Sequence, residues 1–371
     1  MGNNKALAIL YSPKSLIDFT WYYYAHGKAY DWDVLIIACD HELKIKEQCE
    51  KSGMFKNIFC DNVNYDKISR LHQAFIFIEM VFFWIFWKKK TYVKRFFAKK
   101  NINLSYNKHL IASNFCSLDS GLLQCFADSI PTVILEDGMS DYVYRTRKFD
   151  RTIPLNLDSF IAYIMCKMNY ASLNQNGCAR YITKNSIFCD KYSVHPEKMK
   201  YKGYRTINKL GEEIYDRNDY ENYLQTLRKM YDVQSLNICG DVVLFTAPLK
   251  YDDISQEIIA YNTVNYIVKE YSPKRVFIKK HPRDNSNYKF PETVEVEEIP
   301  ANIPAELIID LLDVKKSIFM YTTTVLLSIK SYNNAVLFVY KSLYNDVASY
   351  KKGIDGDLET IELPESNIVF I

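Results

Sequence analysis

The chain has 371 residues, more than the roughly 250 to 300 at which a single hydrophobic core stops growing, so we expect two domains. Its 47 basic and 44 acidic side chains leave a net charge of +3, which argues against a general nucleic-acid binder. The nine cysteines are scattered and form no C-x-x-C pair. This argues against a disulfide scaffold or a zinc site and is typical of reduced thiols in a cytosolic protein.

The first half of the chain alternates apolar runs with helical segments. The strand-like runs are residues 5–11, 32–39, 55–59, 109–113 and 132–135, and the helical segments are 15–26, 44–53 and 121–126. Continuous apolar strands separated by helices are typical of a parallel sheet that is covered on both faces. We therefore predict a Rossmann-like α/β domain over residues 1–204.

One stretch of the first half, residues 74–100, has an unusual composition. Residues 74–87 are AFIFIEMVFFWIFW, and seven lysine or arginine side chains follow between Lys88 and Lys100. The apolar run is too short to cross a bilayer, which takes about 20 apolar residues. It fits a buried helix before a solvated basic one, or a helix at an anionic membrane surface. No signal peptide is visible, so we expect a cytoplasmic chain, with peripheral contact to the inner membrane as an alternative.

A polar zone precedes a second run of the same alternation. Residues 205–238 are rich in Tyr, Asn, Glu and Lys, and we interpret them as a linker with a helix over 219–231. The later strand-like runs are 241–246, 275–279, 294–296, 316–321 and 335–340, with helices at 254–270, 304–312 and 325–331. We predict a second Rossmann-like domain over residues 239–371.

Ligands of open parallel sheets bind beyond the carboxyl ends of the strands, so the residues directly after each predicted strand are the candidates for a site. Glu136, Asp137 and Gly138 come after the run 132–135. Adjacent strand residues face opposite sides of the sheet, so one of the two carboxylates can point into a cleft and act as a general base. Because Asp-Gly is also a common turn dipeptide, a plain acidic turn is the alternative.

A basic cluster follows a strand of the second half. Lys280, His281, Pro282 and Arg283 come directly after the run 275–279. A histidine can donate a hydrogen bond to a phosphate oxygen, and the neighbouring cations add positive charge. A solvated loop is the alternative. A second His-Pro pair, His195-Pro196, follows no apolar strand in the sequence, and we interpret it as structural.

Two polar clusters follow other predicted strands. Thr322, Thr323 and Thr324 lie between a strand and a helix, where hydroxyls and free N–H groups can bind an anion or simply cap the helix. Asn114 follows the run 109–113 and is a further candidate, although asparagine is also common in turns.

Several familiar motifs are missing from the sequence. It contains no G-x-x-x-x-G-K-[ST] or G-x-G-x-x-G loop and no G-x-S-x-G or H-E-x-x-H motif. Two Asp-x-Asp triplets occur. The triplet at 31–33 opens a predicted strand, and the triplet at 355–357 lies in a predicted glycine turn. A metal-binding triplet would be expected directly after a buried strand, so we expect no catalytic metal.

The three motifs, in this order, resemble those of bacterial sialyltransferases of glycosyltransferase families 52 and 38. Those families carry an Asp/Glu-Asp/Glu-Gly motif in the first domain, and a His-Pro and then a Ser/Thr motif in the second. The matching residues here are Glu136-Asp137-Gly138, His281-Pro282 and Thr322-Thr323-Thr324. The run 303–307 (IPAEL) is also similar to a segment near the nucleotide in these families. The third motif is all threonine where serine is common, which leaves the subfamily open.

This resemblance implies a GT-B fold, in which two Rossmann-like domains face a cleft, and a metal-independent inverting transfer. The donor would be CMP-sialic acid and the acceptor a surface glycan of capsule or lipooligosaccharide. Glu136, or alternatively Asp137, would accept the proton of the acceptor hydroxyl, and His281 would donate to the departing phosphate. The expected donor-binding residues are Pro282, Lys280, Thr322, Thr323, Thr324, Pro304, Glu306, Gly138 and Asn114.

Two other functions remain open on the sequence. A transferase with another activated donor, such as Kdo or a polyol phosphate, would also place basic and histidine side chains at a donor phosphate. A non-enzymatic capsule-assembly protein would use residues 74–100 at the membrane surface.

Overall fold

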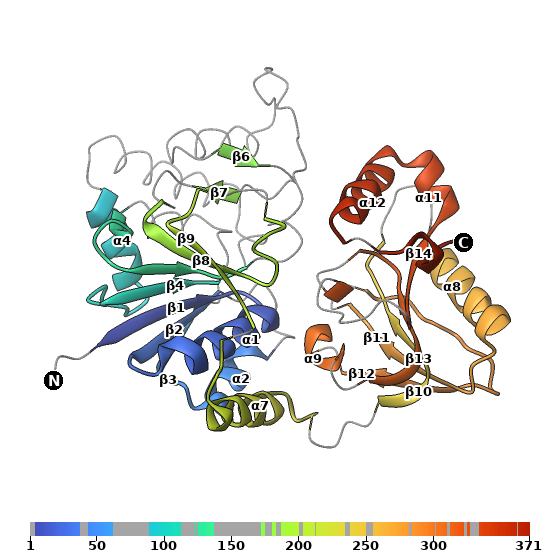
Figure 1. Cartoon of the computed structure of the whole chain (residues 1–371), viewed down its shortest axis with the longest axis horizontal. Coiled ribbons are helices and arrows are strands. Elements are labelled where there is room, and N and C mark those ends of the chain that lie inside the picture. Colours follow the sequence, from blue (N-terminus) through green and yellow to red (C-terminus); the bar gives the residue numbers. More distant parts are fainter. Residues whose placement is uncertain are drawn as a thin grey trace. The chain divides into compact units, whose positions relative to one another are not determined.

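The computed structural model describes most of the chain. The described residues are 4–37, 44–61, 89–112, 122, 125–136, 172–174, 180–182, 187–199, 203–211, 213–233, 238–249, 255–281, 284–300, 302–309, 312–322, 325–326, 334–361 and 363–371. They form two compact units, Met1–Met230 and Tyr231–Ile371, and each unit is built on its own parallel sheet (Figure 1).

The first unit contains a seven-stranded sheet in the order β3-β2-β1-β4-β5-β8-β9, in which all neighbours run parallel. The strands are β1 Lys5–Leu10, β2 Asp31–Ile37, β3 Phe55–Asp61, β4 Lys108–Ile111, β5 Thr132–Ile134, β8 Cys189–Ser193 and β9 Thr206–Lys209. A separate antiparallel pair consists of β6 Ser172–Asn174 and β7 Arg180–Ile182. Inner strands such as β1 are buried on both faces, since five of the six residues Lys5–Leu10 are buried.

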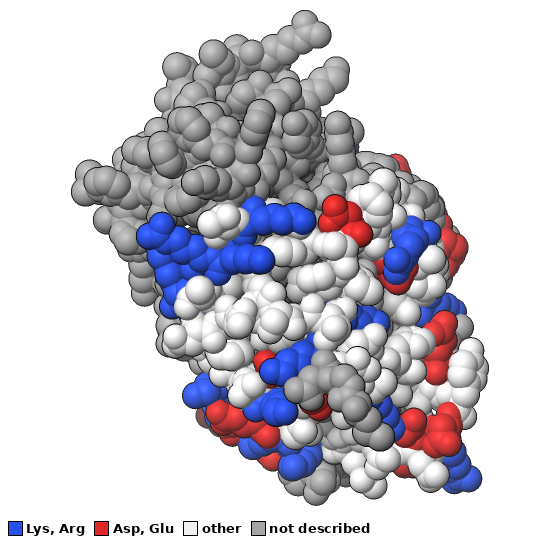
Figure 2. Space-filling view, turned by 90° about the vertical axis from the view of Figure 1, so that its left-hand side faces the viewer, with Lys and Arg blue, Asp and Glu red and all other residues white. Residues whose placement is uncertain are grey.

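The helices of the first unit are α1 Pro13–Tyr22, which continues into a π-helical turn over Tyr23–Gly27, α2 Ile45–Ser52, α4 Lys89–Ala98 and α7 Arg217–Tyr231. Helix α2 ends at Gly53, whose φ of 69° lies in the left-handed region that glycine adopts without strain. Helix α4 buries Val93 and Phe97 in the core and leaves lysine and arginine side chains exposed on the face seen in Figure 2.

The second unit contains a six-stranded sheet in the order β12-β11-β10-β13-β14-β15, again with all neighbours parallel. Its strands are β10 Ile238–Phe245, β11 Arg275–Lys279, β12 Glu295–Ile299, β13 Leu312–Phe319, β14 Ala335–Val339 and β15 Ile368–Phe370. Its helices are α8 Gln256–Tyr271, α9 Ala305–Ile309, α11 Lys341–Asp346 and α12 Ala348–Ile361, and a short 3-10 helix spans Glu365–Asn367.

Both sheets reverse their strand order at one point. The chain moves outward from β1 to β3 and then returns to β4 beside β1, and it repeats this course from β10 to β12 and back to β13. This is the doubly wound Rossmann arrangement, in which ligands bind at the carboxyl ends of the strands next to the reversal. The predicted fold class of two Rossmann-like α/β units is therefore confirmed.

The zone predicted as a linker differs from the structure. Thr206–Lys209 forms the edge strand β9 of the first sheet, and α7 packs on the same unit. The Tyr24 hydroxyl lies 2.8 Å from that of Thr226, Lys28 pairs with Asp219, and Leu227 is buried. The boundary between the units falls after Met230 rather than at residues 204 and 239, because a polar edge strand and an amphipathic helix resemble a linker in composition.

Two smaller expectations also differ. The helix predicted over 304–312 ends at Ile309, and Leu312 already belongs to β13. The triplet 355–357 lies inside α12 and not in a glycine turn. The apolar run 74–87 lies outside the described residues. None of the helices described is long and apolar enough to cross a bilayer.

Candidate functional site

The reversal point of the first sheet begins with a tightly bonded turn between β1 and α1. Ser12 caps α1 by accepting a hydrogen bond from the Ser15 N–H at 3.1 Å, and the Ser15 hydroxyl accepts from the N–H groups of Tyr11 at 3.0 Å and Ser12 at 2.9 Å. Pro13 occupies the first helical turn, where its missing N–H costs nothing. This reciprocal cap fixes the position of Lys14 at the start of the helix.

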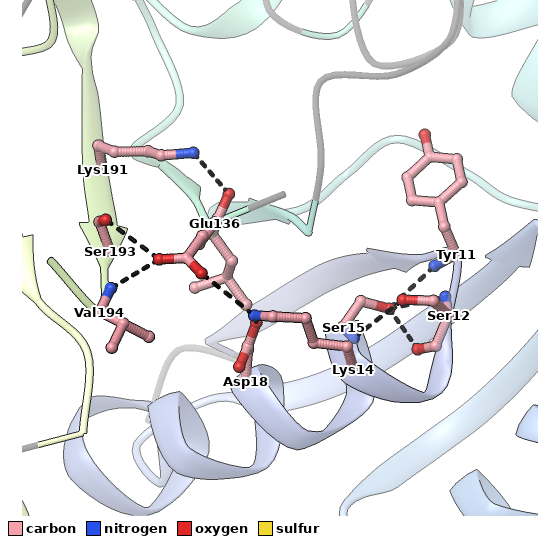
Figure 3. Close-up of polar contacts among 10 residues, drawn as sticks. Tyr11, Ser12, Lys14, Ser15, Asp18, Glu136, Lys191, Ser193 and Val194 are labelled. Atoms are coloured by element: carbon pink, nitrogen blue, oxygen red, sulfur yellow. Dashed lines mark hydrogen bonds and ion pairs between the residues drawn. The ribbon is translucent and has the colours of Figure 1, made fainter. Parts of the chain in front are cut away.

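Glu136 follows β5, two strands away from β1 in the sheet, and is only 3% exposed. Its Oε2 accepts hydrogen bonds from the Val194 N–H at 2.7 Å and from the Ser193 hydroxyl at 3.1 Å. Its Oε1 lies 3.5 Å from the Lys14 Nζ. Figure 3 shows the carboxylate between the end of β8 on one side and α1 on the other.

Two cations and two carboxylates meet at this edge of the sheet. The Lys14 Nζ lies 2.6 Å from Asp18 Oδ2, one helical turn further along α1. The buried Lys191 of β8 donates from Nζ to the Leu135 carbonyl at 2.8 Å, directly before Glu136. Buried charges are tolerated only when they are paired or hydrogen-bonded, and this cluster meets that requirement with equal numbers of each sign.

The cluster provides a fixed carboxylate at the carboxyl edge of the sheet, where a general base for a substrate hydroxyl would stand. Asp137, Gly138 and Asn114, the other candidates for this edge, lie outside the described residues.

In the second unit, His281 is held through its main chain. Its N–H donates to the Thr246 hydroxyl at 3.0 Å, and its carbonyl accepts from the Asp284 N–H at 2.8 Å. Thr246 follows β10, the first strand at the reversal of the second sheet, and is buried. The main chain of His281 is thus anchored to the central strand, while the residue as a whole is exposed.

The buried Asp284 holds the loop that follows His281. Its carboxylate accepts hydrogen bonds from Gln256 Nε2 at 3.0 Å, from the Ser286 N–H at 2.9 Å and from the Tyr288 hydroxyl at 2.8 Å. These bonds tie the loop after β11 to the start of α8, so the loop has a defined course from Asp284 onward.

Lys279 is the last residue of β11 and Lys280 follows it, and the two lysines face different surroundings. Lys279 is only 5% exposed, and burial lowers its pKa to about 8 while the nearby Glu306 carboxylate acts in the opposite direction. Its Nζ donates to the Lys280 carbonyl at 3.2 Å. The Lys280 Nζ pairs with Glu298 Oε1 on β12 at 2.7 Å. The buried cation at this strand end is therefore Lys279, two residues before His281 in the sequence, and it was not among the predicted site residues.

The remaining predicted donor residues differ in what they contact. Thr322 follows β13 and is buried, and its hydroxyl donates to the carboxylate of Asp357 on α12. Pro304 is buried directly before α9, and Glu306 lies half-buried in the first turn of that helix. Pro282, Arg283, Thr323 and Thr324 lie outside the described residues. Thr322, Thr246 and His281 stand at the ends of three adjacent strands, β13, β10 and β11.

The contribution of β8 was not predicted from the sequence. Its residues Cys189–Ser193 alternate between buried and half-buried, but the sequence CDKYS does not alternate apolar with polar residues, since Lys191 and Ser193 are among the buried ones. His195 follows no apolar run, as the sequence indicated, but the polar strand β8 ends two residues before it. His195 is half-buried, with Nδ1 3.1 Å from Glu197 Oε1.

Side chains that commonly bind metals do not cluster at either sheet edge in the described part of the chain. Within those ranges, no group of three or more His, Cys, Asp or Glu side chains is placed to hold a metal ion. In the first Asp-x-Asp triplet, Asp33 accepts hydrogen bonds from Asn57 Nδ2 at 2.8 Å and from the Tyr106 hydroxyl at 2.9 Å, so its carboxylate is used within the fold.

Comparison with known proteins gives a family match. The model of "Glycosyltransferase family 52" matches residues 54–341, more than half of the chain. No curated protein matches the sequence. Similar solved structures include Phytolacca americana UGT2 complexed with UDP-2fluoro-glucose and pterostilbene (9% identity, 96% of this chain and 88% of that chain, TM-score 0.46). Another is Arabidopsis thaliana UGT89C1 complexed with UDP-L-rhamnose (11% identity, 93% and 81%, TM-score 0.47).

Proposed function

Because the chain belongs to glycosyltransferase family 52, we propose that this glycosyltransferase moves sialic acid from CMP-sialic acid to a surface glycan of capsule or lipooligosaccharide, with inversion. The family resemblance predicted from the three motifs is confirmed by the match. The observation that carries the proposal is that the matched range, 54–341, includes both Glu136 and His281, each of which follows a strand of a doubly wound sheet.

In the proposed reaction Glu136 accepts the proton of the acceptor hydroxyl. The carboxylate is oriented by two hydrogen bonds from the end of β8, and a fixed base at the reacting group contributes about 10² to 10⁴ in rate. Asp137 is the alternative base, because consecutive residues at a strand end face opposite sides.

His281 donates to the donor phosphate as the glycosidic bond breaks. Its anchored main chain fits this role, because catalysis by a hydrogen-bond donor depends on its being positioned before the reaction begins. Lys279 adds positive charge from the same strand end. These side chains supply the positive charge that a metal ion provides in other transferases. The proposed reaction therefore needs no metal ion.

We also propose that the enzyme is cytoplasmic and contacts the inner membrane through α4. Lys90, Lys94, Arg95 and Lys99 are exposed, and Figure 2 shows lysine and arginine side chains gathered on this face. The segment from Lys88 to Lys100 contains seven cations and no acidic residue, and such a segment is attracted to anionic lipid headgroups.

Calorimetric titration with CMP in EDTA tests the donor assignment. We expect micromolar binding by the wild type, a loss of at least about tenfold, or 1.4 kcal/mol, in His281→Ala, and no change in the control His195→Ala. His281→Ala should also lower turnover with CMP-sialic acid at least about 100-fold. Absence of CMP binding would contradict the proposal and favour another activated donor, such as one carrying Kdo or a polyol phosphate.

A further inference from the structure

The Lys14 side chain lies between two carboxylates at the reversal point of the first sheet. Its Nζ is 2.6 Å from Asp18 Oδ2 and 3.5 Å from Glu136 Oε1. The three side chains are 19%, 9% and 2% exposed, in the order Lys14, Asp18 and Glu136. They therefore interact away from bulk water, where electrostatic effects are stronger than at the surface.

The two oxygens of Glu136 have different surroundings. Oε2 accepts hydrogen bonds from Ser193 and Val194 of the β8 end, whereas Oε1 faces Lys14 (Figure 3). A carboxylate held by one oxygen keeps its orientation while the other oxygen stays on the side of α1. In the proposed reaction, Oε1 is thus the oxygen whose charge Lys14 influences directly.

Among the contacts of the described residues, Lys14 is the cation whose ammonium faces the Glu136 carboxylate directly. Asp18 is negative and disfavours a second charge nearby, and Lys14 offsets it. The other buried cation of the cluster, Lys191, donates to the Leu135 carbonyl, and Ser193 is neutral. Removing the Lys14 ammonium would leave two buried carboxylates close together, which strongly favours protonation of one of them.

We propose that Lys14 is a positioning residue for the Glu136 base, which it holds through Oε1 from the α1 side while the end of β8 holds Oε2. This inference rests on the proposed function of Glu136. The family match begins at residue 54, so Lys14 and Asp18 lie outside the matched range, and the inference comes from the geometry of this chain alone.

The pH dependence of turnover tests the proposal. In Lys14→Met, the acid limb of the kcat profile with CMP-sialic acid should move to higher pH by about one to two units, with a KM for the donor within about twofold of the wild type. Lys14→Arg retains the cation and should keep the wild-type limb. The matched control is Lys51→Met, which breaks the exposed i,i+4 pair with Glu47 at 2.9 Å and should change nothing. If the acid limb of the kcat profile in Lys14→Met lies at the same pH as in the wild type, the proposal is wrong.

A substrate-free measurement separates this inference from the donor assignment. We expect Lys14→Met to lower the urea midpoint of unfolding at pH 7 when Glu136 is present. In a protein that already carries Glu136→Gln, the same change should lower the midpoint by less than half as much, because the partner of Lys14 is then uncharged. Equal shifts in both backgrounds would overturn the pairing. If the wild type does not turn over CMP-sialic acid, the donor assignment fails, while this comparison still decides whether Lys14 and Glu136 are coupled.

Discussion

The main-chain N–H of Val194 donates a hydrogen bond of 2.7 Å to the carboxylate of Glu136, across 58 residues of sequence. This bond joins the carboxyl ends of β8 and β5, which are neighbours in the sheet. The orientation of the proposed base therefore depends on a strand outside the motif that contains it. Changes at Glu136 are expected to affect both the fold and the reaction, and a test must separate the two.

Glu136→Gln should lower turnover at least about 100-fold, because the amide cannot serve as a base, while its shape preserves most of the packing. Glu136→Ala should also unfold more easily, by about 1–3 kcal/mol, because it leaves the Val194 N–H without its acceptor. Steady-state kinetics with CMP-sialic acid and urea unfolding measure the two effects. Asp137→Asn is the control: if it abolishes turnover while Glu136→Gln remains near wild type, Asp137 is the base.

Lys279→Met should stabilise the protein and weaken donor binding. The pKa of buried Lys279 is lowered to about 8, whereas an unfolded lysine titrates near 10.5. Between pH 8 and 10.5 the unfolded chain binds more protons than the folded protein, so the free energy of unfolding rises with pH. Below about pH 8, burying the charged Lys279 costs the full amount of about 3 kcal/mol. Removing the ammonium should raise the stability at pH 7 by up to about that amount and abolish the rise above pH 8.

Urea unfolding between pH 7 and 10.5 and calorimetry with CMP check both parts of this prediction. The control Lys280→Met removes a lysine that pairs with Glu298 and should leave the alkaline stability profile unchanged. CMP affinity equal to that of the wild type in Lys279→Met would exclude Lys279 from the donor site.

His109 should make the protein sensitive to acid. It is 1% exposed on β4, neither ring nitrogen has a hydrogen-bond partner among the described residues, and burial lowers its pKa to about 4. An unfolded histidine titrates near 6.5, so between pH 4 and 6.5 the unfolded chain binds more protons than the folded protein. The free energy of unfolding therefore falls by about 3 kcal/mol as the pH drops from 6.5 to 4. His109→Leu should flatten this part of the stability profile. An unchanged acid slope in His109→Leu would assign the sensitivity to other groups.

The basic face of α4 should bind anionic vesicles. Each exposed cation contributes about 1 kcal/mol near such a surface, so Lys94→Gln combined with Arg95→Gln should weaken binding to phosphatidylserine-containing vesicles by more than about tenfold. The double variant Lys46→Gln with Lys51→Gln on α2 removes the same charge elsewhere and is the control. Cosedimentation measures both, with phosphatidylcholine vesicles as the uncharged reference. Equal binding by the α4 variant and the wild type would contradict the membrane contact.

The sequence alone determined the two α/β units and the strand ends that carry the candidate residues. Short apolar runs such as 5–11 and 275–279, set between helical segments, are typical of strands buried on both faces of a sheet, and their local pattern predicts both the strand and its end. The short polar strands β8 and β9 have no such run, and the sequence did not reveal them.

Only the tertiary structure decided which partner each candidate side chain contacts. Lys14 reaches Glu136, Lys280 turns to Glu298 on the neighbouring strand, and Thr322 donates to Asp357 on α12. The partners of Glu136 and Thr322 lie far away in sequence, and packing brings them together. Pairings of this kind depend on how strands and helices are stacked, and no local pattern of residues specifies them.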